Sequence, residues 1–238
     1  MPLLVLLVIL LPSLSWATIA EVGAGSQRVN STRVTAADST TAVMPGNVTA
    51  GNWMACAGNI GDNTGGVTSV TVTDSVSTSY TSILGAEYSG NGRSFIAYGQ
   101  VPSTGANTVT VNPSGTNNFI QFGCDEFSAT LPLVVDVDGA SSTGSSTTPS
   151  DTITTVNSDT IIFGVAVGGT SAAITPNDGT QIAESQFAVT LYNFIFSIVS
   201  SATTYTIDWT LGISQAWTAQ TYSLKEQSAR RPVAPVIF

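Results

Sequence analysis

The stretch FIQFGCDEF, residues 119–127, alternates between apolar and polar side chains and sets the expected fold. Successive side chains of an extended chain point to opposite faces, so Phe122 and Cys124 share one face. Gln121 and Asp125 lie on the other. This alternation is typical of a β-strand with one buried face. We therefore predict a strand whose cysteine points toward a hydrophobic core.

The two cysteines of the chain are expected to form a disulfide. In NWMACAG, residues 52–58, alternation places Met54 and Cys56 on one face, so both cysteines point where large apolar residues point. A Cys56–Cys124 bridge closes a loop of 68 residues, which the chain-entropy estimate makes worth about 4 kcal/mol. We expect it to hold the layers of the fold together. The alternative is two buried free thiols that pack as small hydrophobic residues.

Many other short segments alternate in the same way between Gly, Asn, Ser and Pro, which predicts an all-β fold. We expect one domain over residues 18–226, a two-sheet antiparallel sandwich resembling a jelly roll. Its pseudo-repeated halves lie at about 51–137 and 152–226, and residues 138–151, which lack large apolar side chains, are expected to be a loop or linker. Two tandem immunoglobulin-like sandwiches are the alternative.

The repeat is inferred from the order of the segments. Residues 95–96 correspond to 194–195, and residues 108–109 correspond to 206–207, at nearly the same offset. Each half offers about five short strands and a modest apolar set. Pairing the halves face to face would bury both sets, which favours the single domain.

Composition excludes several classes of function. Only 9% of the residues are charged and the net charge is −9, so the chain lacks the basic stripe that a nucleic-acid binder needs. It contains no histidine, which removes the usual general base and the common zinc ligand sets. Its glutamates show no arrangement typical of a glycosidase. We therefore expect no catalytic activity.

The first residues have the features of a secretory signal peptide. An apolar run is followed by Pro12 and by small residues that fit cleavage after Ala17. We expect residues 1–17 to be removed, leaving a secreted chain with no membrane span, and residues 227–238 to form a tail or linker. A membrane anchor is the alternative, but the run is short for one.

Three stretches resemble a pattern found in secreted bacterial and phage-associated β-sandwich domains. They are SVTVTDSVSTSYT (69–81), FIAYGQVPSTGANTVTV (95–111) and FIQFGCDEFSA (119–129). Such domains are mostly of unknown function and are described as fibronectin-like or lectin-like. The chain departs from the pattern at residues 76–77, where Gly-Asn is usual, and at residues 128–129, where Ser-Gly is usual. The resemblance implies a fold and an extracellular setting, and no catalytic residues.

The segment TVTDSVSTSYT, residues 71–81, predicts a strand, a turn and a second strand. Asp74 and Ser75 are expected to accept hydrogen bonds from backbone N–H groups two residues further on, which closes an Asx-type turn. The alternative is a role for Asp74 in ligand binding. The turn explains the hydroxyl-rich composition without any chemistry.

Two sets of residues are candidates for a site. Asp136 and Asp138 lie two apart before a glycine and are the candidate calcium ligands; no other cofactor is expected. A row of exposed rings would stack on a glycan, and the candidates for it are listed here: Tyr98, Tyr192, Trp209 and Trp217. Solvated carboxylates and ordinary core packing are the alternative explanations.

The function expected from these features is that of a non-catalytic extracellular module that binds carbohydrate or mediates surface adhesion. Its partner is then a glycan, a cell surface or a virion. The alternative is a self-associating structural subunit, such as a component of a phage fibre, a pilus-like assembly or a surface layer. Low charge and exposed sheet edges favour this alternative.

Overall fold

The computed structural model describes residues 18–35, 37–61, 66–88, 92–115, 119–169, 173–187 and 190–227. Besides one 3₁₀ turn (Val22–Gly25), these residues form strands, listed in chain order: β1 (Ala20–Glu21), β2 (Val29–Asn30), β3 (Val34–Thr35), β4 (Thr40–Val48), β5 (Trp53–Gly61), β6 (Val70–Asp74), β7 (Thr81–Tyr88), β8 (Gly92–Gln100), β9 (Gly105–Pro113), β10 (Phe119–Ser128), β11 (Leu133–Val137), β12 (Ser141–Ser146), β13 (Ser150–Thr154), β14 (Thr160–Gly168), β15 (Ile174–Pro176), β16 (Thr180–Phe187), β17 (Thr190–Val199), β18 (Thr204–Leu211) and β19 (Gln215–Glu226).

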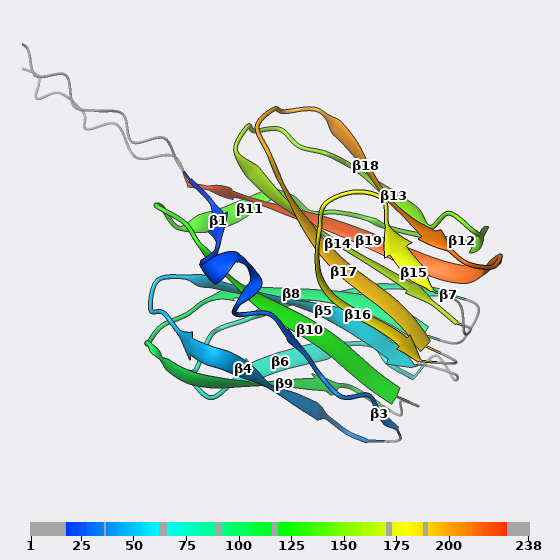
Figure 1. Cartoon of the computed structure of the whole chain (residues 1–238), viewed down its shortest axis with the longest axis horizontal. Helices are drawn as coiled ribbons and strands as arrows, with labels where there is room; N and C mark the ends of the chain where they lie inside the picture. Colours follow the sequence, from blue (N-terminus) through cyan, green and yellow to red (C-terminus); the bar gives the residue numbers. More distant parts are fainter. Residues whose placement is uncertain are drawn as a thin grey trace, which may run out of the picture.

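The strands form four antiparallel sheets in four layers (Figure 1). The first large sheet has the order β1-β10-β5-β8-β7, and the second large sheet has the order β11-β19-β14-β17-β16. The first small sheet is β4-β9-β6, and the second small sheet is β13-β18-β15. From the bottom of Figure 1 the layers are the first small sheet, the two large sheets and the second small sheet. The predicted all-β antiparallel sandwich architecture is confirmed, but the chain forms four sheets where two were predicted.

Alternating side chains hold the first small sheet against the first large sheet. Phe122 and Cys124 on β10 pack with Val109 and Val111 on β9, all fully buried. Asp125 points to the opposite face of β10, as the alternation predicted. At about 25 cal/mol per Å² of apolar surface removed from water, this packing is the main force that joins the two layers.

The two large sheets pack on each other through aromatic side chains. Phe127 on β10 meets Phe163 on β14 and Phe196 on β17 edge-on, with ring centroids 5.3 and 5.0 Å apart. The backbones also approach closely: a Cβ at Gly123 would lie 2.0 Å from the Cβ of Ala183. Large side chains and one glycine therefore set the fit between the two halves of the chain.

A third core lies between the second large sheet and the second small sheet. Trp209 on β18 is fully buried there and donates a hydrogen bond from Nε1 to Oδ1 of Asn193 at 3.1 Å. Strand β14 is buried along its whole length, because one face contacts this core and the other contacts the central one. Continuous burial explains its unbroken apolar sequence.

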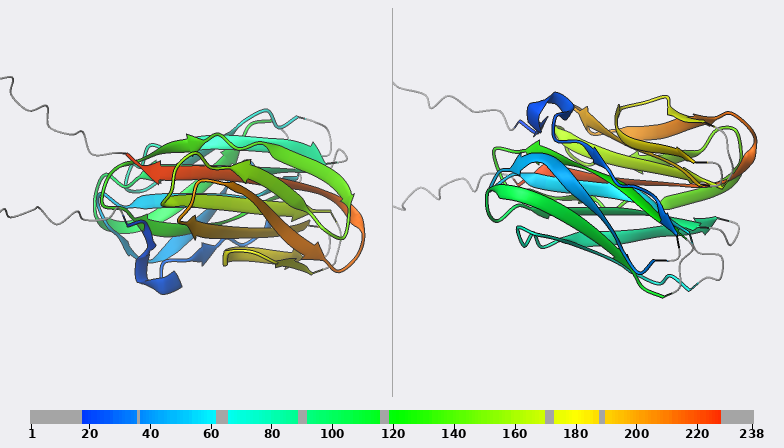
Figure 2. Two further views of the ribbon diagram at one scale, coloured as in Figure 1. Left: turned by 90° about the horizontal axis from the view of Figure 1, so that it is seen from above. Right: turned by 60° about the horizontal axis from the view of Figure 1, so that its bottom comes forward.

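The two halves of the chain have the same strand order. Strands β4 to β10 and β13 to β19 fill equivalent places in their small and large sheets. Residues 95–96 and 194–195 lie on the equivalent strands β8 and β17, and residues 108–109 and 206–207 lie on β9 and β18. Each half is thus a sandwich with its own core, and the large sheets pack back to back (Figure 2).

Residues 138–151 are not the uninterrupted loop that was predicted. They contain β12, which pairs with β19, and the first residues of β13. Gly144 lies against the ring of Trp217, where a Cβ would be 2.5 Å from the ring, and Ser146 accepts a hydrogen bond from Trp217 Nε1. Strand β12 covers the ring of Trp217 and has room only for small residues there. This explains why large apolar side chains are absent from it.

The predicted signal peptide, residues 1–17, lies outside the described residues, as does the predicted tail apart from Gln227. Thr18 lies within hydrogen-bond distance of Thr130, and the Gln227 N–H donates to the carbonyl of Pro132, so the two ends of the described chain lie near each other. The start of β1 and the end of β19 lie at the same end of the stack in Figure 2. Among the described residues there is no helix with the length and hydropathy of a membrane span.

Candidate functional site

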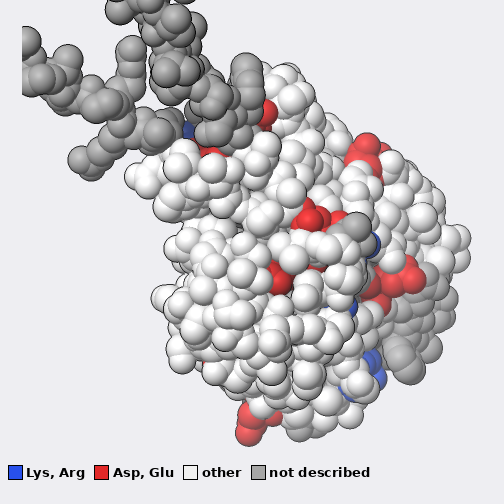
Figure 3. Space-filling model, turned by 60° about the vertical axis from the view of Figure 1, so that its left-hand side comes forward, with Lys and Arg blue, Asp and Glu red and all other residues white. Residues whose placement is uncertain are grey.

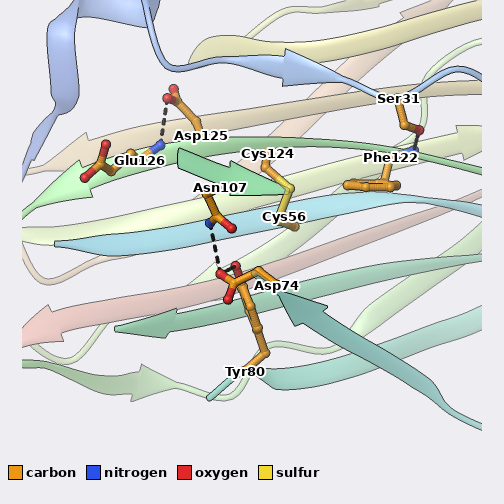
Figure 4. Close-up of a disulfide and its surroundings, with 9 residues drawn as sticks. All are labelled: Ser31, Cys56, Asp74, Tyr80, Asn107, Phe122, Cys124, Asp125 and Glu126. Carbon is orange, nitrogen blue, oxygen red and sulfur yellow. Dashed lines mark hydrogen bonds between the residues drawn. A yellow bond between two sulfur atoms is a disulfide. The ribbon is translucent and has the colours of Figure 1, made fainter. Parts of the chain in front are cut away.

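The predicted disulfide is present but joins neighbouring strands of one sheet. Cys56 on β5 lies directly opposite Cys124 on β10, with an S–S distance of 2.02 Å (Figure 4). Both sulfurs are buried against the first small sheet. The expectation that the bridge fastens two layers together is therefore wrong: the layers are held by apolar packing, and the bridge fixes the centre of the first large sheet.

Asp74 closes a turn, although over a longer reach than predicted. Its Oδ1 accepts a hydrogen bond from the N–H of Thr78, four residues on, at 2.8 Å. Its Oδ2 accepts hydrogen bonds from the Tyr80 hydroxyl at 2.9 Å and from the Asn107 amide at 3.0 Å (Figure 4). Burial, and then the charge of Asp74, raises the pKa of Tyr80. The carboxylate is thus occupied by three donors from its own sandwich and acts as a structural group.

The predicted row of exposed rings is wrong, because all four rings are core residues. Trp209 and Tyr192 are fully buried, while Trp217 and Tyr98 are 7% and 8% exposed. Each polar atom has a partner inside the protein: the Tyr98 hydroxyl, for example, lies 2.9 Å from that of Tyr222. A ring that fills a core cannot stack on a sugar, so these residues form no binding face.

Of the two predicted calcium ligands, Asp136 and Asp138, the first is held in contacts within the protein. The strand pairing shifts between Val135 and Val137, so the alternation that placed the two carboxylates on one face is interrupted at Asp136. Asp136 accepts hydrogen bonds from the N–H of Val156 at 3.0 Å and from the Asn157 amide at 2.6 Å, and Lys225 Nζ lies 3.8 Å away. These contacts give Asp136 a structural role, and the calcium site stays a prediction. Among the described residues no group of three or more potential metal ligands occurs.

A buried ionic cluster at the N-terminal end of the fold was not predicted. Asp125 is fully buried, and Arg28 Nε lies 3.3 Å from its Oδ2 and 2.6 Å from Oε1 of Glu21. Burial raises the pKa of Asp125 to about 8; Glu21 adds to this rise and Arg28 opposes it. The cluster ties the segment with β1 and β2 to the edge of β10.

The neighbouring Glu126 has a different structural role. It is buried on the other face of β10, where its Oε1 accepts hydrogen bonds from the Thr49 N–H and the Asn52 amide, both at 2.7 Å. It therefore holds the connection between β4 and β5. The only signal in the sequence for either site was the presence of two acids in an otherwise apolar strand.

The outer face of the first small sheet carries ranks of threonine. Thr41, Thr110 and Thr73 are directly paired across β4, β9 and β6, and Thr71 pairs with Asn112 in the next rank. The inward positions of the same strands are mostly apolar, with Thr40 and Asn107 as buried polar exceptions. Of the outward threonines, Thr41 and Thr73 are exposed and Thr110 is half-buried. The outward positions of these three strands carry no charged residue.

The outer face of the second small sheet has the same character. Thr152 pairs with Thr206, and Thr154 pairs with Thr204, with hydroxyl oxygens 3.5 and 2.8 Å apart. One outward carboxylate, Asp208, occupies this face. On the side of the molecule that Figure 3 shows, charged residues likewise form small separate patches on a mostly uncharged surface.

No family model, no curated protein and no solved structure matches this chain. Of the candidate groups described above, the threonine faces are the ones that solvent reaches.

Proposed function

We propose that this protein is a non-catalytic extracellular module that binds a neutral carbohydrate surface through the outer face of its first small sheet. The rank of Thr41, Thr110 and Thr73 carries this proposal. A disulfide supports an extracellular setting, because such bonds persist in oxidising compartments. The absence of histidine and the internal use of Asp74, Asp125 and Asp136 support a role without catalysis.

The face offers regularly spaced hydroxyl and methyl groups. Neighbouring strands lie about 4.8 Å apart and alternate residues along a strand lie about 6.7 Å apart. Each threonine hydroxyl donates one hydrogen bond and accepts others, and its methyl group contacts C–H groups. A sheet face without a ring to stack on a single sugar suits an extended, uncharged polymer or a packed polysaccharide surface better than a small free glycan.

The self-associating subunit remains the second candidate. Val43, 66% exposed on the edge strand β4, favours it, because an exposed apolar side chain on a sheet edge promotes pairing between copies. Pro45 on the same strand opposes it, since proline cannot donate a hydrogen bond to an added strand. Light scattering that gives a monomer at all concentrations would remove this candidate.

The test is a pull-down of the full secreted chain with insoluble cellulose, chitin and mixed-linkage glucan, with and without a calcium chelator. We expect at least one of these polymers to retain the chain, equally well after chelation. Thr110→Arg places a charge in the centre of the rank and should weaken retention severalfold. Thr81→Arg, at an exposed threonine on β7 in the first large sheet, is the matched control and should bind normally. Retention of Thr110→Arg at the wild-type level would refute the proposal.

A further inference from the structure

We propose that the protein is bivalent: the second small sheet is a second binding face, and one molecule bridges two carbohydrate surfaces. The inference rests on the proposed function of the first face. It follows from the order of the layers, because the large sheets cover each other and each small sheet covers the remaining face of its own large sheet. The outer faces of the two small sheets therefore point away from each other (Figure 1).

The two faces are built from equivalent strands. The inward residues of these strands differ between the two halves, whereas threonine recurs at outward positions. On the central strands, the inward residues change from Val109 and Val111 on β9 to Ile207 and Trp209 on β18. The outward positions of both central strands carry threonine, and the edge strands add Thr152 and Thr154 on β13 but only Thr41 on β4. The two cores are filled by different side chains, while the hydroxyl face is present in both halves.

The charges on the two faces define the kind of polymer that they can share. The first face is uncharged, whereas the second carries Asp208. Burial, and then the neighbouring Asp208, raises the pKa of the Asp178 carboxyl. An anionic polysaccharide would be repelled at this end, and the net charge of −9 adds to the repulsion. Both faces therefore fit a neutral polymer, and the second should bind it somewhat less tightly.

The test uses suspended microcrystalline cellulose and chitin particles, with bound protein measured in the pellet and particle clustering measured by light scattering. The wild-type chain should bind the particles and should cluster them at intermediate protein concentration. Excess protein should reverse the clustering, because it saturates the surface of each particle separately. Thr110→Arg and Thr206→Arg alter one face each. Either variant alone should still bind but should not cluster particles, and the double variant should do neither. Thr81→Arg should behave as wild type.

The outcomes separate this inference from the function on which it rests. If the wild-type chain does not bind any particle, the proposed function fails. If it binds but Thr206→Arg changes neither binding nor clustering, the first face is the only one and bivalency is refuted. Clustering that survives in either single variant also refutes it, because bridging must then come from paired copies, which light scattering of the protein alone would detect.

Discussion

Removing the disulfide tests how the two halves depend on each other. The bridge joins Cys56 and Cys124 across a loop of 68 residues, and both cysteines are fully buried. The entropy of the unfolded chain that this loop restricts amounts to about 4 kcal/mol at 25 °C. For a domain of this size each kcal/mol corresponds to roughly 2–4 °C in Tm. The variant Cys56→Ala/Cys124→Ala should therefore melt roughly 10–15 °C below the wild type.

The shape of the transition is as informative as its midpoint. The bridge lies wholly in the first half, but the central core contains side chains of both halves. We expect a single calorimetric transition that moves as a whole, and the same shift when wild type is reduced. Reduction should not change the double variant, which serves as the control. Two separate transitions, of which only one moves, would refute the coupling through the central core, and a shift below about 3 °C would refute the entropic estimate.

Two further perturbations test the packing of the large sheets and the N-terminal ionic cluster. Gly123→Ala forces a Cβ to within 2.0 Å of that of Ala183 and should lower the free energy of unfolding by about 1–3 kcal/mol, while Gly105→Ala, whose nearest neighbour atom lies 3.8 Å away, should melt as wild type. Asp125 has its pKa raised from 3.8 to about 8 in the folded chain, so the folded state holds its proton more tightly than the unfolded state. Stability from this group is full below pH 4 and is lost as the pH rises to about 8; Asp125→Asn should flatten this part of the Tm profile, and a wild-type profile that is already flat would contradict the assignment.

Alternation along single strands predicted the local features of the fold well. It placed Cys124 on the correct face of β10 and identified the disulfide, because the direction of a side chain in a strand depends only on the two-residue period. It failed at Asp136, where the pairing shifts and the period is interrupted. The register shift depends on how β11 pairs with β19. The sequence of β11 alone does not show which strand it will pair with.

The number of layers was harder to predict, because it depends on what covers the second face of each large sheet. The continuous apolar run of β14 is the local sign that both faces are covered, and it points to more than two layers. Exposure of the aromatic residues depends on the same question. Tyr192 fills the core between the two large sheets and Trp209 fills the third core, so the number of rings in the sequence overestimated how many are exposed.

The layer order also restricts where this protein can bind anything. Both large sheets are covered on both faces, so side chains on those strands contact ligands only at the sheet edges and loops. Among the described strands, only those of the small sheets expose a whole face, and they place threonine where a glycan-binding sheet that relies on stacking would place rings. Under the proposed function, affinity would come from many weak, repeated contacts to a repeating ligand, since each net hydrogen bond contributes only about 1 kcal/mol. A fold that stacks two such sandwiches back to back doubles those contacts only if the ligand is present on both sides of the molecule.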